Sequence, residues 1–207
     1  MRIVAYSNEY MPTCRAGAQT MLRDLLRPLK DRHQVDIVVH NPRGMTAPYT
    51  WDGLPVHPES PEALDIVRAA DLIITQIYAT EPAARIAEER DIPVIQLMHG
   101  DEQPDREFLR HRCDFLVFNS EWIRESFVEY TGPSAVIYPP VQPEEYRTTP
   151  GDRVALVNIT DVKGSAVFYA LAERYPELPF LGVIGAYGRQ DIRTMPTVEI
   201  APSVDDM

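Results

Sequence analysis

The stretch that decides the fold is Arg2-Ile3-Val4-Ala5-Tyr6-Ser7, which is followed by a loop at residues 8–17 and a periodic segment at residues 18–29. The first six residues are mostly apolar, as in a buried strand. The apolar residues of the periodic segment recur with the spacing of one helix face: Ala18, Met21, Leu22, Leu25, Leu26 and Leu29. This stretch therefore predicts a strand, a loop and an amphipathic helix, and Pro28 predicts a kink or an early helix end.

The loop between strand and helix contains Pro12 and Gly17, which are both uncommon inside regular structure. A strand that enters such a loop and then a helix directs backbone N–H groups and the positive helix end at one point. That arrangement suits an anion such as a phosphate. The fingerprint Gly-x-Gly-x-x-Gly of ordinary dinucleotide sites is absent. A phosphate site and a plain strand–helix unit without a ligand both fit these residues.

The same alternation continues through the first 140 residues. Apolar runs that predict further strands lie at residues 35–39, 71–76, 92–98, 115–118 and 135–138. Segments that predict helices lie at residues 61–70, 81–90, 105–112 and 120–130, and a hairpin is expected at residues 49–57. Strands that are apolar on both faces and alternate with helices predict a parallel, doubly wound α/β sheet.

Proline and polar residues at 139–143 and 148–152 then interrupt the pattern and predict a linker. Beyond it, strands are expected at residues 154–157, 180–185 and 197–200, with a helix between the first two. About fifty residues are too few for a whole second α/β domain. We therefore expect one domain at residues 1–140, a linker at 141–152, and a partial second Rossmann-like unit at 153–207.

Composition limits the possible partners and compartments. The net charge of −11 and the isoelectric point near 4.9 argue against a nucleic-acid partner or an anionic membrane surface. Cys14 and Cys113 have neither metal-ligand spacing nor the pattern of a disulfide framework. A signal peptide and a long apolar segment are both absent from this sequence. We expect a cytoplasmic protein with no integral membrane segment, and the composition does not indicate an oligomeric state.

Six short motifs, in their order and spacing, resemble the family-four glycosyltransferases of the GT-B fold, in which two Rossmann-like domains face each other across a cleft. They are Arg-Ala-Gly-Ala at 15–18, Asp-Gly-Leu-Pro-Val at 52–56, Val-Ile-Gln-Leu-Met-His-Gly at 94–100, Asn-Ser-Glu at 119–121, Val-Ile-Tyr-Pro-Pro-Val at 136–141, and Leu-Val-Asn-Ile-Thr-Asp-Val-Lys-Gly at 156–164. The resemblance implies an acceptor-side domain followed by the start of a donor-side domain. It further implies sugar transfer from a nucleotide-sugar donor to an unknown acceptor, with retention of configuration and without a metal ion or other cofactor.

The resemblance also implies roles for particular residues in the first domain. His99 would lie beside the transferred sugar as the catalytic residue, although a histidine at a strand end can equally be structural. Backbone at Ala16 and Gly17 would approach the donor diphosphate, where a larger side chain would collide with it. Candidates for the acceptor side are Arg15, Asp101 and Glu102, for which a solvated loop is the alternative.

In the second unit the resemblance places Lys163, Gly164 and Asn158 at the donor diphosphate, with the lysine as a compact positive charge. Asn158 occupies a place where many relatives carry arginine, so it supplies hydrogen bonds but no charge. The paired-glutamate segment of the family belongs beyond Met207, so we expect the 207-residue chain to be inactive alone. Two other functions stay open: a non-catalytic sugar- or protein-binding module derived from a transferase, and a sugar-nucleotide 2-epimerase of the GT-B fold.

Overall fold

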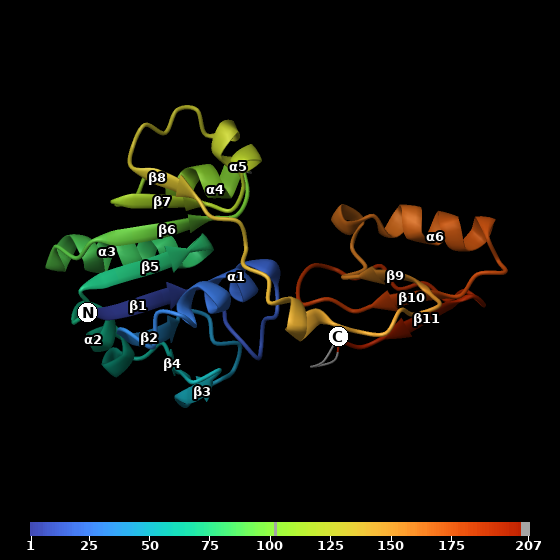
Figure 1. Cartoon of the computed structure of the whole chain (residues 1–207), viewed down its shortest axis with the longest axis horizontal. Helices are drawn as coiled ribbons and strands as arrows, with labels where there is room; N and C mark the ends of the chain where they lie inside the picture. Colours follow the sequence, from blue (N-terminus) through green and yellow to red (C-terminus); the bar gives the residue numbers. More distant parts are fainter. Residues whose placement is uncertain (102, 204–207) are drawn as a thin grey trace. The chain divides into compact units, whose positions relative to one another are not determined.

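The computed structural model describes residues 1–101 and 103–203 and divides the chain into two compact units (Figure 1). Unit 1 is Met1–Val141 and unit 2 is Gln142–Met207. Over these described residues each unit contains its own sheet, with eight strands in unit 1 and three in unit 2. The protein is therefore a mixed α/β chain built from a large sheet and a small one.

Unit 1 begins with the predicted strand, loop and helix. Strand β1 is Arg2–Ser7, helix α1 is Gly17–Leu26, and strand β2 is Gln34–Val39. Strands β1 and β2 pair in parallel along their whole length. Helix α1 ends at Leu26, ahead of Pro28, so the early helix end expected from that proline is confirmed.

The remaining elements of unit 1 are β3 (Tyr49–Trp51), β4 (Leu54–Pro58), α2 (Pro61–Arg68), β5 (Leu72–Gln76), η1 (Ile77–Ala79), α3 (Thr80–Arg90), β6 (Val94–Met98), α4 (Gln103–Phe108), β7 (Phe115–Phe118), α5 (Glu121–Ser126) and β8 (Ser134–Val136). The strand order is β3-β4-β2-β1-β5-β6-β7-β8. All neighbouring strands are parallel except the β3–β4 hairpin. The predicted doubly wound parallel sheet and the predicted hairpin are both confirmed.

Helix α5 is shorter than the sequence predicts. Its start agrees with the prediction, because the Ser120 hydroxyl accepts a hydrogen bond from the backbone N–H of Ile123 at 3.2 Å. The predicted end near residue 130 is wrong, since the helix stops at Ser126. Phe127 leaves the helical conformation and packs against Phe118, with ring centroids 5.8 Å apart. Burial of this ring, a tertiary contact, overrides the local helical pattern.

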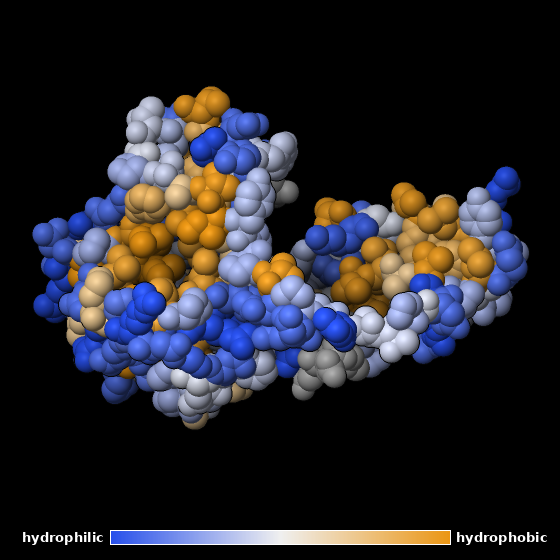
Figure 2. Space-filling view, in the orientation of Figure 1, coloured by the Kyte–Doolittle hydropathy of each residue, from blue (hydrophilic) through white to orange (hydrophobic). Residues whose placement is uncertain are grey.

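Hydrophobic layers form on both faces of the large sheet. Helix α1 covers one face over β1 and β2, whereas α2, α3 and α5 pack on the other. On the α1 side, the partly buried Leu72, Ile95 and Phe115 continue the apolar face along β5, β6 and β7. Figure 2 shows apolar surface over these strands. Within the described residues, the layer on the α1 side is therefore less completely covered than the other.

The strand order reverses between β1 and β5. From β1 the chain builds outward to β2 and β4, and from β5 it builds in the opposite direction to β6, β7 and β8. Open parallel sheets bind ligands at such a reversal, at the carboxyl ends of the strands. The residues at the carboxyl ends of β1, β5 and β6 are therefore the strongest candidates for a ligand-binding site.

Unit 2 contains η2 (Pro143–Tyr146), β9 (Val154–Val157), η3 (Asp161–Lys163), α6 (Ser165–Arg174), β10 (Phe180–Val183) and β11 (Val198–Ala201). Its sheet is parallel in the order β11-β10-β9. Phe168, Tyr169 and Ala172 of α6 pack against Phe180 of β10. This strand–helix–strand arrangement is Rossmann-like, as the sequence predicts.

Candidate functional site

Three polar side chains meet at the carboxyl edge of the large sheet, at the point where the strand order reverses. Ser7 ends β1, Gln76 ends β5, and His99 follows β6 directly. The Gln76 Nε2 group donates to Ser7 Oγ at 3.0 Å, and Gln76 Oε1 lies 2.8 Å from His99 Nε2. The three side chains form a continuous hydrogen-bonded network across three neighbouring strands.

His99 is partly buried, and its environment favours the neutral ring. Burial lowers its pKa from the ordinary 6.5 to about 4, because the charged imidazolium loses hydration. Its backbone carbonyl accepts a hydrogen bond from the Asn119 side chain, which follows β7, at 3.2 Å. The histidine is therefore held from both sides and is uncharged at neutral pH.

The backbone next to Gln76 adopts an unusual conformation. Ile77, the next residue, has a φ angle of 53°, in the left-handed region that β-branched residues rarely adopt. It begins η1, so the chain turns sharply as it leaves the strand. Such conformations cluster at functional sites, where the surrounding structure holds them in place. The turn keeps Gln76 at the very end of β5, with its side chain fully buried.

The network continues into the first loop. The Ser7 hydroxyl donates to the backbone carbonyl of Glu9 at 2.8 Å. Farther along this loop, the Met11 carbonyl accepts a hydrogen bond from the Tyr49 hydroxyl, and the Arg15 guanidinium lies over the ring of Trp51 at 5.3 Å. The β3–β4 hairpin therefore contacts the loop, and it accounts for one interaction of Arg15.

The predicted phosphate-binding backbone lies where this loop becomes helix α1. Ala16 is the extended residue before the helix, and Gly17 is the first helical residue. Gly17 is exposed, and a Cβ atom added there would have no neighbour within 4 Å. Packing within the protein therefore does not require glycine at this position, and the space in front of it is open.

The two carboxylates predicted for the acceptor side follow His99 closely. Asp101 is partly buried in the segment between β6 and α4. Glu102 lies outside the described residues. The structure thus places Asp101 within two residues of the histidine, at the same edge of the sheet.

In unit 2, Asn158 follows β9 and holds two loops together. It has a φ angle of 64° and is only 6% exposed. Its Oδ1 accepts a hydrogen bond from Gln190 Nε2 at 2.8 Å, whereas its Nδ2 has no partner among the described residues. A Cβ atom added at Gly185 would lie 2.3 Å from Asn158 Cβ, so the two loops approach as closely as glycine permits. Asn158 therefore has a structural role whatever it binds.

Lys163 and Gly164 lie at the start of α6. Lys163 ends η3 and is exposed, with no side-chain partner among the described residues. Gly164 precedes α6 with a φ angle of 88°, which explains glycine there by backbone conformation alone. A hollow of about 480 Å³ lies nearby, lined by Asp161, Arg189, Gln190, Asp191, Ile192 and Arg193. This end of unit 2 therefore presents Lys163 and two arginines near a helix N-terminus, and one of them, Arg193, is paired with Asp191 at 2.7 Å.

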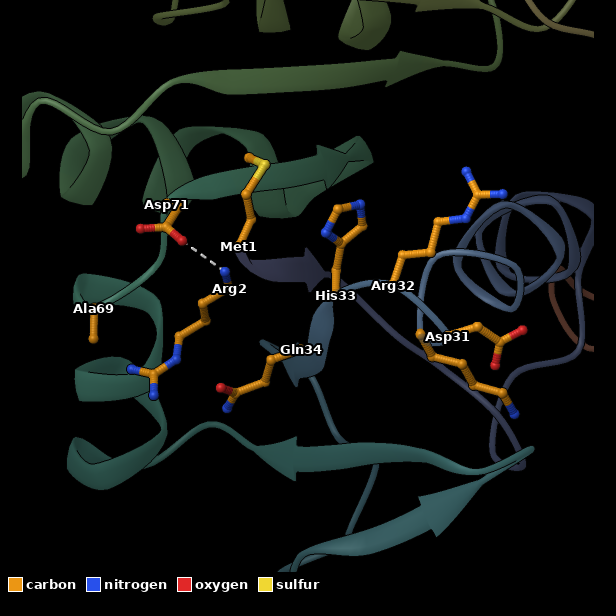
Figure 3. A pocket seen from close by; sticks show the side chains of 9 residues that line it. Met1, Arg2, Asp31, Arg32, His33, Gln34, Ala69 and Asp71 are labelled. Atoms are coloured by element: carbon orange, nitrogen blue, oxygen red, sulfur yellow. Dashed lines mark hydrogen bonds between the residues drawn. The ribbon is translucent and has the colours of Figure 1, made fainter.

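A shallow hollow of about 610 Å³ lies at the opposite edge of the large sheet, where β1 and β2 begin (Figure 3). There the backbone N–H of Arg2 donates to Asp71 at 2.7 Å. The side chains of Arg2 and Arg32 point away from each other, so their charges do not converge (Figure 3). Since β1 is about 17 Å long, this hollow is separate from the network around His99.

The cysteines do not contribute a reactive group. Burial raises the pKa of the Cys14 thiol to about 11, and burial also raises that of Cys113. Both thiols are free and protonated at neutral pH. In the described part of the chain, no group of three or more His, Cys, Asp or Glu side chains is arranged to hold a metal ion.

A sequence model described as Glycosyltransferase Family 4 matches residues 15–145. The match covers most of unit 1, from the first loop to the start of unit 2. The chain belongs to glycosyltransferase family 4. A search of curated proteins finds no match. In the described part of this family 4 chain, no helix has the length and apolar character needed to cross a membrane.

Solved structures resemble the family 4 chain in fold. The Anabaena protein HepE, crystallised with UDP and glucose, superposes with a TM-score of 0.65 at 16% identity, over 87% of this chain and 60% of HepE. An α-glucosyltransferase in complex with UDP and a DNA 13-mer gives a TM-score of 0.57 at 15% identity, over 88% of this chain and 55% of that protein. At these identities the likeness shows the fold alone. The family 4 chain thus spans little more than half the length of these proteins.

Sequence reasoning missed two members of the network in this family 4 chain, Ser7 and Gln76. Both are the polar last residue of a largely apolar strand. Parallel strands end at the same edge of a sheet, so polar residues at those ends are a usable signal. The sequence alone does not show that β1 and β5 are neighbours, and that adjacency is what brings Ser7 and Gln76 together.

Proposed function

We propose that the protein containing this chain transfers a sugar from a nucleotide-sugar donor to an acceptor hydroxyl, with retention of configuration. The observation that carries the proposal is the family 4 match over residues 15–145, which includes the end of the first loop, Gln76 and His99. The fold likeness to HepE, which was crystallised with UDP and glucose, supports the donor class. In this proposal unit 1 is the acceptor-side domain and unit 2 begins the donor-side domain.

Within unit 1, His99 contacts the sugar being transferred, and the backbone at Ala16 and Gly17 approaches the diphosphate. The open space in front of Gly17 supports this assignment, because it leaves room for a phosphate at the N-terminus of α1. The neutral state of His99 supports a contact with a sugar, because a neutral imidazole keeps one ring nitrogen that can accept a hydrogen bond from a hydroxyl, whereas imidazolium has none. Arg15, Asp101 and Glu102 are proposed to line the acceptor side.

Within unit 2, Lys163 and the backbone at Gly164 hold the diphosphate as the bond to the sugar breaks. The electron pair of that bond leaves with the phosphate oxygen, so a nearby positive charge stabilises the leaving group. Asn158 contributes through its unpartnered Nδ2 group and through the loop that it holds. We propose that the charge of Lys163 and these hydrogen bonds act in place of a metal ion.

The test is turnover of nucleotide sugars by the full-length native protein. UDP-, GDP- and ADP-sugars are supplied with a mixture of polyol and glycan acceptors, and release of the nucleoside diphosphate is measured. Release that depends on the acceptor supports the transferase. Conversion of the donor to a different sugar nucleotide with no net release contradicts it and indicates an epimerase. Binding without turnover indicates a non-catalytic module.

A further inference from the structure

We propose that Gln76, held by Ser7, is a positioning residue that fixes His99 as its Nε2–H tautomer, so that Nδ1 accepts a hydrogen bond from a substrate hydroxyl. The identity of the substrate rests on the proposed function, whereas the tautomer does not. The direction of each hydrogen bond in the network is fixed in turn, starting from a backbone carbonyl that can only accept.

The backbone carbonyl of Glu9 can only accept a hydrogen bond, so the Ser7 hydroxyl donates its one proton to it. Ser7 Oγ is then left as an acceptor for the neighbouring amide. It therefore takes a proton from Gln76 Nε2, at 3.0 Å. This contact orients the amide with its nitrogen toward Ser7 and its oxygen toward His99.

The Gln76 oxygen can likewise only accept. His99 Nε2, which lies 2.8 Å away, must therefore carry the proton. Burial keeps the ring neutral at pH 7, so Nδ1 carries a lone pair and no proton. Nδ1 has no hydrogen-bond partner in residues 1–101 and 103–203, and it is not among the fully buried polar atoms that lack one. His99 Nδ1 is therefore available to accept a hydrogen bond from a ligand.

An unprotonated Nδ1 selects the chemistry of its partner. It can accept from a hydroxyl or an N–H group, but it cannot donate to a phosphate, a carboxylate or a carbonyl oxygen. The network therefore assigns His99 to a sugar or acceptor hydroxyl and not to the diphosphate. An imidazolium at this place could donate to the diphosphate but could not accept from a hydroxyl, because both of its nitrogens are donors.

The parts of the network that fix the tautomer are themselves rigid. Ser7 and Gln76 are both fully buried, and they are directly opposite residues on the paired strands β1 and β5. Ile77 turns the chain immediately after Gln76, which ends the strand at that residue. A fully buried amide that lost either contact would carry an unpaired polar group, which is strongly unfavourable away from water. Its orientation is therefore strongly held.

The direct test is nitrogen NMR on the wild-type chain labelled with ¹⁵N-histidine at pH 7, with the His99 signals assigned through a His99→Gln variant. We expect a pyrrole-type signal for His99 Nε2 and a pyridine-type signal for Nδ1. The opposite pattern, or two equivalent nitrogens as in imidazolium, overturns the proposal. This measurement requires neither substrate nor turnover, so its result is independent of the proposed function.

Variants of the full-length protein then separate positioning from simple packing. In Gln76→Glu, a carboxylate faces His99 and should raise its pKa, so that the ring becomes charged and Nδ1 becomes a donor. We expect kcat to fall at least about tenfold at pH 7 and to recover partly at higher pH, as the ring loses its proton. Ser7→Ala should leave a mixture of His99 tautomers.

Thr75→Val is the matched control on the same strand, because the Thr75 hydroxyl is buried and has no hydrogen-bond partner in the part of the chain that the structure describes. It should leave the His99 nitrogen signals and kcat unchanged. Loss of kcat in Gln76→Glu with no change in the His99 pKa would overturn the positioning role and leave Gln76 as packing alone. If Gln76→Glu fails to fold, the wild-type nitrogen spectrum still decides the proposal.

Discussion

Acid should selectively weaken unit 1 through His99. Its pKa is about 4 in the folded protein, against an ordinary value of 6.5. Between these two values the unfolded chain binds a proton more readily than the folded chain does. Stability therefore falls as the pH drops from 6.5 toward 4, and this contribution is constant above and below that window.

The magnitude follows from the same two values. At pH 5.5 the unfolded histidine is mostly protonated and the folded one mostly neutral, which costs about 1.4 kcal/mol relative to pH 8. In His99→Gln the cost disappears, because the amide does not titrate. Comparing wild type with His99→Gln isolates the histidine from every other group that titrates over the same range. At pH 5.5 the protein is still above its isoelectric point near 4.9, which favours solubility.

Urea unfolding followed by tryptophan fluorescence reports on the stability of unit 1, the part of the chain that contains His99. The chain has two tryptophans, Trp51 and Trp122, and both belong to unit 1 together with His99. Between pH 8 and pH 5.5, wild type should lose about 1.4 kcal/mol more unfolding free energy than His99→Gln. Equal losses in the two proteins would mean that His99 titrates normally, and the account of its burial would be refuted.

Three further substitutions test the diphosphate assignments and the packing of unit 2. Gly17→Val should weaken binding of a nucleoside diphosphate by about tenfold or more, measured by calorimetry. The melting temperature should not change, because no neighbouring group lies within 4 Å of the new Cβ. Unchanged affinity would mean that the loop is not part of the binding site. Lys163→Gln should also weaken that binding about tenfold and reduce its dependence on salt concentration. If the wild-type protein binds with equal affinity in high and low salt, Lys163 makes no charge contact with the ligand. Gly185→Ala should destabilise unit 2 by about 1–3 kcal/mol, measured by amide hydrogen exchange in β10, because the new Cβ would lie 2.3 Å from Asn158 Cβ. Gly151→Ala, with no neighbour within 4 Å, is its control, and equal protection in both variants would contradict the packing described here.

Local patterns were sufficient to predict much of the fold. The first strand, loop and helix follow from apolar spacing within thirty residues, and the start of α5 follows from Ser120 as a cap. The end of α5 does not follow from a local pattern, because Phe127 leaves the helix and packs against Phe118, which belongs to a separate element. Element boundaries depend on such tertiary contacts, and a single sequence does not display them.

The site was predictable only in part for a related reason. His99 and Gly17 each stand out at the end or start of a regular element, so their positions at the carboxyl edge could be predicted. Gln76 and Ser7 are 69 positions apart and meet only because β5 pairs with β1. Their hydrogen bond, and hence the tautomer of His99, depends on strand order, which alternating patterns leave open. The roles of these residues in sugar transfer stay predictions.

The most direct test of a nucleotide-sugar site in this chain is to map where nucleoside diphosphates bind. UDP, GDP and ADP are titrated separately into the ¹⁵N-labelled 207-residue chain, and the backbone amide signals are followed by NMR. At least one of the three should shift the amides of Ala16 and Gly17 and those of Lys163 and Gly164. Shifts confined to the hollow lined by Arg2 and Arg32, or no shifts at millimolar concentration with any of the three, would contradict the account.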